Sequence, residues 1–581
     1  MAPTLLRLLH ARVDQALYDA FGPTASTAEI LVQPTRDPRH GDFSCPAPMA
    51  LARTLRRRPD ELALRLATVL DVTGICEAPE VAPPGFVNLR LRRDWLEARI
   101  GALVGDQGLG VGPVARPRRI VIDYSGPNVA KEMHVGHLRS TIIGDCLANV
   151  AQTLGHDVQR VSHVGDWGTQ FGMLIAHLDD VLAAGEDHPE RIADAEVLYR
   201  EASARFREDM GFRDRARRRV VDLQSGEGEA RATWQSLVDL STTENAKVYE
   251  LLGVKGLVNQ GESTYQPVLA QIVADLEAGG LVVVDDGAKC VFVPGFTNIE
   301  GEPLPLIVQK ADGAYNYATT DLAALRSRVE QGAEELLYVA DAGQSQHFEM
   351  VFAVARMAGW LPKGVEARHV AFGLVLGEDG QRLRTRSGDN VRLADLLEEA
   401  LARARAFVAA RAQERVEDVP EDIDEVARVV GLGAVRYADL SQNRQSNYVF
   451  SFDRMLSLKG NTAPYLQYAY ARIRSILREA DWIGRHGSAD VALAEPQERA
   501  LAVRLVMLAD VVERVAAEQL PSLLCTHLYE LSQAYSQFYE HCPVLRADEP
   551  VRTSRLALCQ ATATALSEGL GLLGIEVLER I

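Results

Sequence analysis

The sequence predicts a multidomain α/β protein, in which a Rossmann-like, doubly wound parallel-sheet domain stands between an α+β N-terminal module and an all-helical C-terminal domain. Three observations support this prediction. The 581 residues are too many to share one hydrophobic core. A strand–helix–strand pattern begins near residue 119, and the pattern becomes almost entirely helical after residue 393.

Residues 1–112 are expected to form the α+β module. Helical periodicity begins at Leu5, and two further helices are predicted at 48–54 and 59–70. Alternating apolar and polar residues at 85–90 predict a strand. The mixture of helices with a short strand is typical of a small α+β domain.

Residues 113–395 are expected to form the sheet domain. A buried strand at 119–124 leads through a Gly/Pro/Asn loop into a helix that ends near Gly155. Together with the next strand this is one βαβ unit. A highly charged helical segment predicts an insertion at about 179–290. The sheet is then expected to resume in strand-like runs at 281–284, 304–308, 336–339 and 369–376.

Composition narrows the function classes. The net charge of -18 favours an enzyme with a small substrate, but a nucleic-acid partner needs only a local basic surface. Seven cysteines without a CxxC pair argue against a zinc site or a disulfide framework and fit a reducing cytosol. No apolar run is long enough to span a membrane, and no signal peptide is recognised, so we expect a cytoplasmic location.

The segment after the first strand carries a nucleotide-binding pattern. Neither a Walker A loop nor GxGxxG occurs, but His134-Val135-Gly136-His137 stands at the start of the predicted helix. A helix N-terminus offers free N–H groups to phosphates, and Gly136 lets a nucleotide approach the backbone. The two imidazoles can donate hydrogen bonds to a phosphate. Alone, the tetrapeptide is weak evidence, because packing could equally explain two such histidines.

The wider segment at 125–141 reads SGPNVAKEMHVGHLRST and resembles the signature of class I arginyl-tRNA synthetases. Further matches to that family follow in order along the chain, at 41–43, 85–88, 164–172, 315–324, 343–348 and 464–473. The resemblance implies an arginine–tRNA ligase that activates L-arginine with ATP to arginyl-adenylate. It then transfers arginine to the 2′-OH of the terminal adenosine of tRNA-Arg. Mg²⁺ is expected with the ATP phosphates, without assigned protein ligands, and the chain is expected to be a monomer.

The resemblance also implies individual site residues. Catalysis and ATP binding are assigned to Lys131, His134, Gly136 and His137. Arginine binding is assigned to Gly126, Pro127, Asn128, His137, Glu262, Tyr317, Asp321 and Gln344. Carboxylates suit a guanidinium because its planar fork of N–H donors can engage them bidentately. Asp321 has a second interpretation, as the N-cap of a helix.

The second ATP loop of class I synthetases, of KMSKS type, is degenerate here. It resembles residues 380–388, with Arg382, Arg384, Thr385 and Arg386 assigned to ATP and Thr385 in place of the second lysine. A surface loop rich in arginine is an equally good interpretation. Lys131, one of only seven lysines, is expected to replace the missing ammonium at the phosphates. The alternative interpretation of Lys131 is a lysine in a solvated loop.

The tRNA is expected to bind at both ends of the chain. Residues 396–455 are predicted to be a helical connection, and 456–581 resemble an anticodon-binding domain in which Tyr468 and Arg472 are candidate tRNA contacts. By resemblance the N-terminal module would also bind tRNA. The competing interpretation of Tyr468 is packing in a hydrophobic core. For the N-terminal module, the competing interpretation is a solvated cationic face.

Two other functions remain open at this stage. The degenerate second loop is compatible with a tRNA-binding paralogue that has lost activation. The HxGH pattern is also compatible with a small-molecule nucleotidyltransferase, for which the helical C-terminal third would have no role.

Overall fold

The computed structural model describes residues 3–25, 32–35, 37–168, 170–183, 195–298, 300–384, 391–414, 422–483 and 489–581. The chain forms two compact units. One unit contains residues 1–115, 412–422 and 457–581, and the other contains residues 116–411 and 423–456. Among the described residues, no helix has the length and apolar character needed to cross a membrane.

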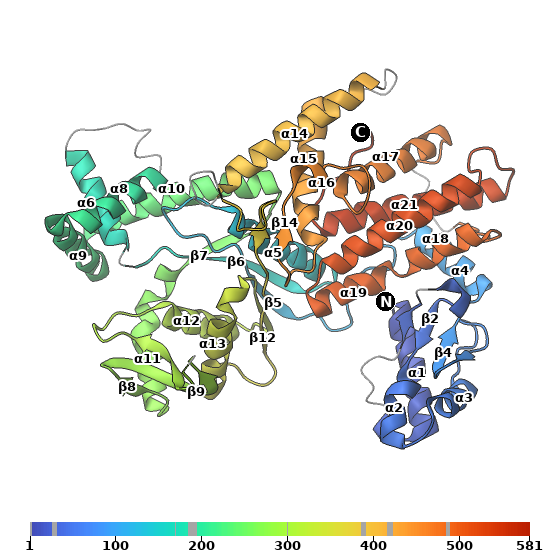
Figure 1. Ribbon diagram of the computed structural model, residues 1–581, viewed down its shortest axis with the longest axis horizontal. Coiled ribbons are helices and arrows are strands. Elements are labelled where there is room, and N and C mark those ends of the chain that lie inside the picture. Colours follow the sequence, from blue (N-terminus) through green and yellow to red (C-terminus); the bar gives the residue numbers. More distant parts are fainter. Residues whose placement is uncertain are drawn as a thin grey trace. The chain divides into compact units, whose positions relative to one another are not determined.

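A five-stranded parallel sheet forms the centre of the unit that contains residues 116–411 (Figure 1). Its strand order is β12-β11-β5-β6-β7. The strands are β5 (Arg119–Asp123), β6 (Asp157–Val164), β7 (Val258–Gly261), β11 (Glu335–Tyr338) and β12 (Glu366–His369). All neighbouring pairs are parallel. The prediction of a doubly wound parallel sheet is therefore confirmed.

The strand order reverses between β5 and β11. From β5 the chain proceeds through helix α5 (Val135–Thr153) to β6 and then β7, whereas β11 and β12 lie on the other side of β5. In open parallel sheets the loops at such a reversal separate and leave a crevice at the carboxyl ends of the strands. The crevice therefore lies where the segment after β5 enters α5.

Within the described residues, four helices lie in the connection between β6 and β7. Their bounds are α6 (Gln170–Ala183), α8 (Ala195–Glu208), α9 (Met210–Ser225) and α10 (Gly228–Leu252). They share a core that includes Phe171, Phe212 and Trp234. These helices belong to the charged insertion that the sequence predicts, and their own core explains how a long insertion remains folded.

Two predicted strands do not rejoin the parallel sheet. The segments at 281–284 and 304–308 instead lie in a separate antiparallel sheet of β8 (Val283–Asp285), β9 (Ala288–Thr297) and β10 (Pro303–Gln309). The expectation for these segments was wrong because Asp286-Gly287, both at positive φ, turns β8 directly back onto β9. Helices α11 (Gln266–Ala278), α12 (Tyr317–Glu330) and α13 (Ser345–Met357) lie nearby (Figure 1) and share a core with β9 and β10.

The predicted continuous strand at 369–376 is also wrong. β12 ends at His369, and the chain then turns before β13 (Val375–Leu376), which pairs with β14 (Tyr448–Val449). The remaining helices of this unit are α14 (Leu393–Glu414), α15 (Ile423–Leu440) and α16 (Phe452–Met455).

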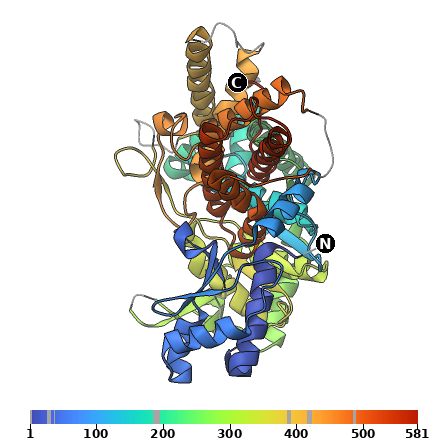
Figure 2. The same cartoon turned by 90° about the vertical axis from the view of Figure 1, so that its right-hand side faces the viewer.

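The other unit combines the N-terminal module with the C-terminal helices (Figures 1 and 2). The module has an antiparallel sheet of β1 (Gln33–Pro34), β2 (Phe43–Cys45), β4 (Phe86–Leu89) and β3 (Glu80–Ala82). Its helices are α1 (Leu5–Phe21), α2 (Ala47–Leu55), α3 (Pro59–Val69) and α4 (Arg93–Val104). The C-terminal helices are α17 (Ala463–Glu479), α18 (Pro496–Val506), α19 (Leu508–Glu518), α20 (Ser522–His541) and α21 (Val551–Leu572).

An ion pair connects these two parts of the unit. The guanidinium of Arg499 on α18 donates to both carboxylate oxygens of Asp42, at 2.8 and 2.6 Å. Asp42 also accepts the backbone N–H of Leu91 at 2.7 Å. Gly41 precedes it at φ 86°, where a Cβ atom would lie 2.6 Å from the carbonyl oxygen of Leu89. Residues 41–43 therefore form part of the contact between the N-terminal module and the C-terminal helices.

All seven cysteines are buried free thiols.

Candidate active site

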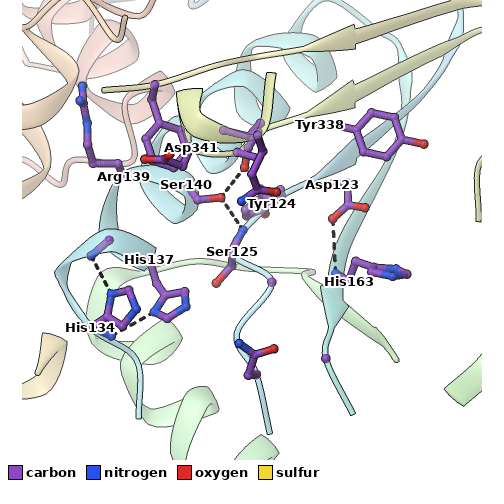
Figure 3. A pocket seen from close by; sticks show the side chains of 18 of the residues that line it. Asp123, Tyr124, Ser125, His134, His137, Arg139, Ser140, His163, Tyr338 and Asp341 are labelled. Atoms are coloured by element: carbon purple, nitrogen blue, oxygen red, sulfur yellow. Dashed lines mark hydrogen bonds between the residues drawn. The ribbon is translucent and has the colours of Figure 1, made fainter. Parts of the chain in front are cut away.

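A pocket of about 810 Å³ lies at the carboxyl ends of β5 and β11 (Figure 3). It occupies the position that the reversal of strand order predicts. Ten of the predicted site residues line it: Gly126, Asn128, His134, Gly136, His137, Glu262, Tyr317, Asp321, Gln344 and Arg382. They come from the loop after β5, the start of α5, the turn after β7, α12, the segment after β11 and the segment after β13.

The backbone fixes the tautomers of the two histidines. His134 is the N-cap of α5, and its Nδ1 accepts the N–H of Gly136 at 3.1 Å. Nδ1 of His137 accepts the N–H of His134 at 3.0 Å. Because Nδ1 is an acceptor in both rings, a neutral ring carries its proton on Nε2. Figure 3 shows the two rings side by side, with centroids 4.0 Å apart.

Both imidazoles are kept neutral by their surroundings. Burial lowers the pKa of His134, and the nearby Lys131 ammonium lowers it further. Burial lowers the pKa of His137 to about 3. The pair therefore presents neutral N–H donors at physiological pH, which suits contact with phosphate oxygens. Gly136 is required beside them, because a Cβ atom there would lie 2.8 Å from the His134 ring.

The loop after β5 is held in a strained conformation. Ser125 and Ala130 have φ angles of 73° and 59°, in the left-handed region that side chains rarely adopt. Ser140 on α5 accepts the N–H of Ser125 at 2.8 Å and donates to the carbonyl of Val339 at 2.6 Å, as Figure 3 shows. One buried hydroxyl therefore ties the loops after β5 and β11 together.

The lining of the pocket also includes acidic side chains. Asp321 lies on α12, and its Oδ2 is 2.6 Å from Nε2 of His347. Glu262 follows β7 and is only 9% exposed. Burial, followed by the charges of Asp321 and Asp166, raises the pKa of Glu262 to about 8. Two carboxyl groups beside Tyr317 and Gln344 make a pocket that favours a ligand with a cationic, planar head.

Asp321 is not a helix N-cap. Helix α12 begins at Tyr317 with Asn316 as its N-cap, so Asp321 lies inside the helix. The N-cap interpretation of Asp321 was therefore wrong.

Several lining residues were missed by the sequence analysis. Asp123 ends β5, and its Oδ2 is 2.8 Å from the buried guanidinium of Arg328. Arg139, 1% exposed, donates to the carbonyls of Gly373 and Ser446 at 2.7 and 3.1 Å. The place of Asp123 at the end of the first parallel strand was a usable signal. Nothing in the sequence indicated the partners of Arg139, because they are distant along the chain.

Other predicted site residues do not line the pocket. Pro127 and the exposed Arg384 are outside its lining, although Arg382 beside Arg384 is part of it. Thr385 and Arg386 lie outside the described residues. The Lys131 ammonium lies 4.9 Å from the centroid of the Tyr199 ring, and Lys131 is exposed.

The candidate tRNA contacts lie in the other unit. Tyr468 and Arg472 are on α17, and the Arg472 guanidinium lies 4.7 Å from the centroid of the Tyr539 ring. Tyr468 is partly exposed, so it is not confined to a packed core.

Family comparisons agree with this arrangement. The family model described as tRNA synthetases class I (R), catalytic domain, matches residues 102–452, which is more than half of the chain. The chain belongs to the class I arginyl-tRNA synthetase family. Two further models of that family's architecture match, the arginyl-tRNA synthetase N-terminal domain at 7–91 and the DALR anticodon-binding domain at 466–581.

Relatives of the family match the chain over nearly its full length. The arginine–tRNA ligase of Synechococcus elongatus is 52% identical over 582 residues, covering 99% of each chain. That of Nostoc punctiforme is 51% identical over 578 residues, again with 99% of each chain. Among solved structures, Plasmodium falciparum arginyl-tRNA synthetase has a TM-score of 0.85 at 28% identity, with 100% of both chains covered. The Thermus thermophilus enzyme has a TM-score of 0.83 at 26% identity, covering 99% and 100%.

Proposed function

We propose that this chain is an arginine–tRNA ligase, which activates L-arginine with ATP and transfers it to tRNA-Arg. The observation that carries the proposal is the composition of one pocket. Neutral imidazole donors at the start of α5 and the carboxyl groups of Glu262 and Asp321 line this same pocket. A triphosphate and a guanidinium need these two environments within reach of each other.

In the first step the arginine carboxylate attacks the α-phosphate of ATP, giving arginyl-adenylate and pyrophosphate. The Nε2–H groups of His134 and His137 donate to phosphate oxygens as negative charge builds up on them. Glu262, Tyr317, Asp321 and Gln344 hold the guanidinium. Asn128 and His137 hold the main-chain groups of the amino acid, beside the loop at 126–127.

In the second step the 2′-OH of the terminal tRNA adenosine attacks the activated carbonyl, and AMP leaves. Positioning and charge stabilisation are sufficient for both steps, so no covalent nucleophile is required. Mg²⁺ would travel with the ATP phosphates. Among the described residues, no group of three His, Cys, Asp or Glu side chains could hold a metal ion.

The unit that joins the N-terminal module to the C-terminal helices is proposed to bind tRNA. Residues 1–112 and 456–581 would be its two tRNA-binding parts, with 396–455 as the connection from the catalytic residues 113–395. The partly exposed Tyr468 and the exposed Arg472 on α17 suit stacking on bases and contact with phosphates.

We propose that the chain acts as a monomer in the cytoplasm. Every residue that lines the pocket comes from one unit of one chain. The seven buried thiols suit a reducing compartment.

The test is ATP–pyrophosphate exchange measured with and without tRNA-Arg. The proposal, with the family resemblance, predicts exchange that requires L-arginine and is seen only when tRNA is present. Exchange that ignores arginine would indicate a different nucleotidyltransferase. Binding of tRNA without any exchange would indicate a paralogue that has lost activation.

A further inference from the structure

Three carboxyl groups, those of Asp166, Glu262 and Asp321, gather at the acidic part of the pocket, and they differ in their partners. Asp321 is 2.6 Å from Nε2 of His347. Asp166, which is buried, accepts the backbone N–H of Ser263 at 2.8 Å and the Ser263 hydroxyl at 2.6 Å. Glu262 has no hydrogen bond or ion pair within the described part of the chain, although it is only 9% exposed.

This difference determines where a proton resides. Ionised carboxylates that lie close together without a cation repel one another, and burial increases the repulsion because water cannot screen it. Burial raises the pKa of Asp166, but its two bonds from Ser263 stabilise its charged form, and Asp321 has the contact to His347. Glu262 has no such bond, so protonating it relieves the repulsion at the lowest cost.

We propose that Glu262 carries a proton in the empty pocket and releases it to solvent when the arginine guanidinium binds between Glu262 and Asp321. This inference rests on the proposed function and assigns different roles to the two carboxyl groups. Asp321, oriented by His347, meets the guanidinium from one side. Glu262 becomes an anion only when the substrate cation arrives. Its O–H bond breaks, the proton passes to the buffer, and the guanidinium keeps its own charge.

The groups that face Glu262 come from several elements. Asp321 on α12 and Asp166 in the turn after β6 both raise the pKa of Glu262, after burial, to about 8. Tyr317 on α12 also faces it, and burial together with Glu262 raises the pKa of that phenol above its ordinary value. His347 on α13 acts through its contact with Asp321. Burial and these neighbouring charges therefore raise the pKa of Glu262 into the neutral range.

The consequence is arginine binding that depends on pH. At pH 7 a carboxyl group with a pKa of about 8 is mostly protonated, so binding should release about 0.9 proton per arginine. At pH 8 the release should fall to about 0.5 proton, and affinity should be about fivefold higher than at pH 7. Arginine itself keeps both its cationic groups over this interval, so the change reports on the protein.

The experiment is calorimetric titration of L-arginine into the full-length chain with tRNA-Arg present. Buffers of different ionisation enthalpy, phosphate and Tris, give the number of protons released at pH 7 and pH 8. Wild type should show the release described above, and Glu262→Gln should bind arginine more weakly with none. The exposed Glu300, changed to Gln, is the matched control and should leave the release unchanged.

The results separate failure of this inference from failure of the proposed function. Arginine that binds wild type without proton release, or with release that persists in Glu262→Gln, overturns the role of Glu262 and leaves the ligase function intact. A chain that neither binds arginine nor catalyses arginine-dependent exchange overturns both.

A second measurement needs no ligand. The fold raises the pKa of Glu262 above its unfolded value, so wild type loses stability as pH rises from about 4.5 towards 8. Glutamine does not ionise. Glu262→Gln should therefore raise the thermal unfolding midpoint more at pH 8 than at pH 5. An equal shift at both values would mean that Glu262 is ionised in the empty pocket, which would contradict the proposal.

Discussion

The two histidines at the start of α5 are proposed to act through their Nε2–H groups. Backbone N–H groups occupy both Nδ1 atoms, and burial keeps the rings uncharged. A neutral donor that is already oriented contributes to the transition state without a proton being transferred. The rate of arginine activation should therefore depend on where these donors lie and not on their protonation state.

Replacing His137 by Ala tests this role. We expect kcat for arginine-dependent exchange to fall by roughly 10²–10³-fold, as on removal of an oriented donor to developing charge, with a smaller change in KM. The wild-type rate should show no inflection near pH 6.5 from His137, because burial lowers its pKa to about 3. The exposed His541, changed to Ala, is the control. An unchanged kcat in the His137 variant would remove this residue from the mechanism.

The proposed role of Lys131 requires its side chain to move. Its ammonium lies over the Tyr199 ring and does not line the pocket, so contact with ATP requires it to leave that ring. Lys131→Ala should lower the activation rate about 10- to 100-fold, the loss expected for one charge-assisted hydrogen bond, and leave tRNA affinity unchanged. Lys247→Ala, which removes another exposed lysine of the same unit, should leave the activation rate and the tRNA affinity unchanged. Equal loss of activation and tRNA binding would contradict the assignment.

At the scale of elements, the turn between β7 and α11 places the acidic side of the pocket. Gly261 ends β7 directly before Glu262, and a Cβ atom on it would lie 1.9 Å from Oδ2 of Asp166. A real side chain cannot stand at that distance, so either the turn or Asp166 must move. Glycine at this position is what allows Asp166 to approach the turn and accept its two bonds from Ser263.

Gly261→Ala should therefore damage arginine binding selectively. We expect KM for arginine to rise about tenfold or more, the effect of losing roughly 1.4 kcal/mol of binding, while KM for ATP changes little. Gly364→Ala is the matched control, since no atom lies within 4 Å of its Cβ position. Equal increases in both KM values would mean that the whole pocket is distorted, contrary to this account.

Elements that depend on local pattern were predicted well, and those that depend on pairing were not. The start of the predicted helix, placed by sequence at Gly136, lies within one residue of the observed start of α5 at Val135. The strands at 281–284 and 304–308 were recognised as strands but assigned to the wrong sheet. Apolar runs indicate burial, whereas the choice of partner depended on the turn at Asp286-Gly287.

At the scale of the whole molecule, the Asp42–Arg499 pair connects sequence segments more than 400 residues apart within one unit. Asp42 is nearly buried, and Arg499 is partly buried. The N-terminal module and the C-terminal helices are therefore coupled by an ion pair whose loss leaves a desolvated carboxylate without its cation.

Arg499→Ala should weaken the contact between the N-terminal module and the C-terminal helices. We expect a loss of about 1–3 kcal/mol in the free energy of unfolding, measured by urea denaturation, and a higher KM for tRNA with little change in KM for arginine. The surface pair between Arg514 and Glu518 provides the control, because removing Arg514 should cost well under 1 kcal/mol. Unchanged stability and KM for tRNA would show that the pair does not couple the two parts.

The site could be predicted only in part from residue chemistry. The spacing at 134–137 indicated a phosphate site directly, because a helix start and two imidazoles form a local pattern. Asp321 and Gln344 were named through family resemblance, since nothing near them in the sequence indicates a guanidinium. His347 was missed although it lies beside Gln344. Its meaning depends on its 2.6 Å contact with Asp321, which only the fold creates.

The most direct test of the central claim is a crystal structure of the chain with ATP and L-arginine bound. We expect the triphosphate to lie at the start of α5, with Nε2 of His134 and of His137 facing it. The guanidinium should lie between Glu262 and Asp321. If ATP and arginine were bound elsewhere in the crystal and this pocket held neither, the assignment of the active site would be wrong.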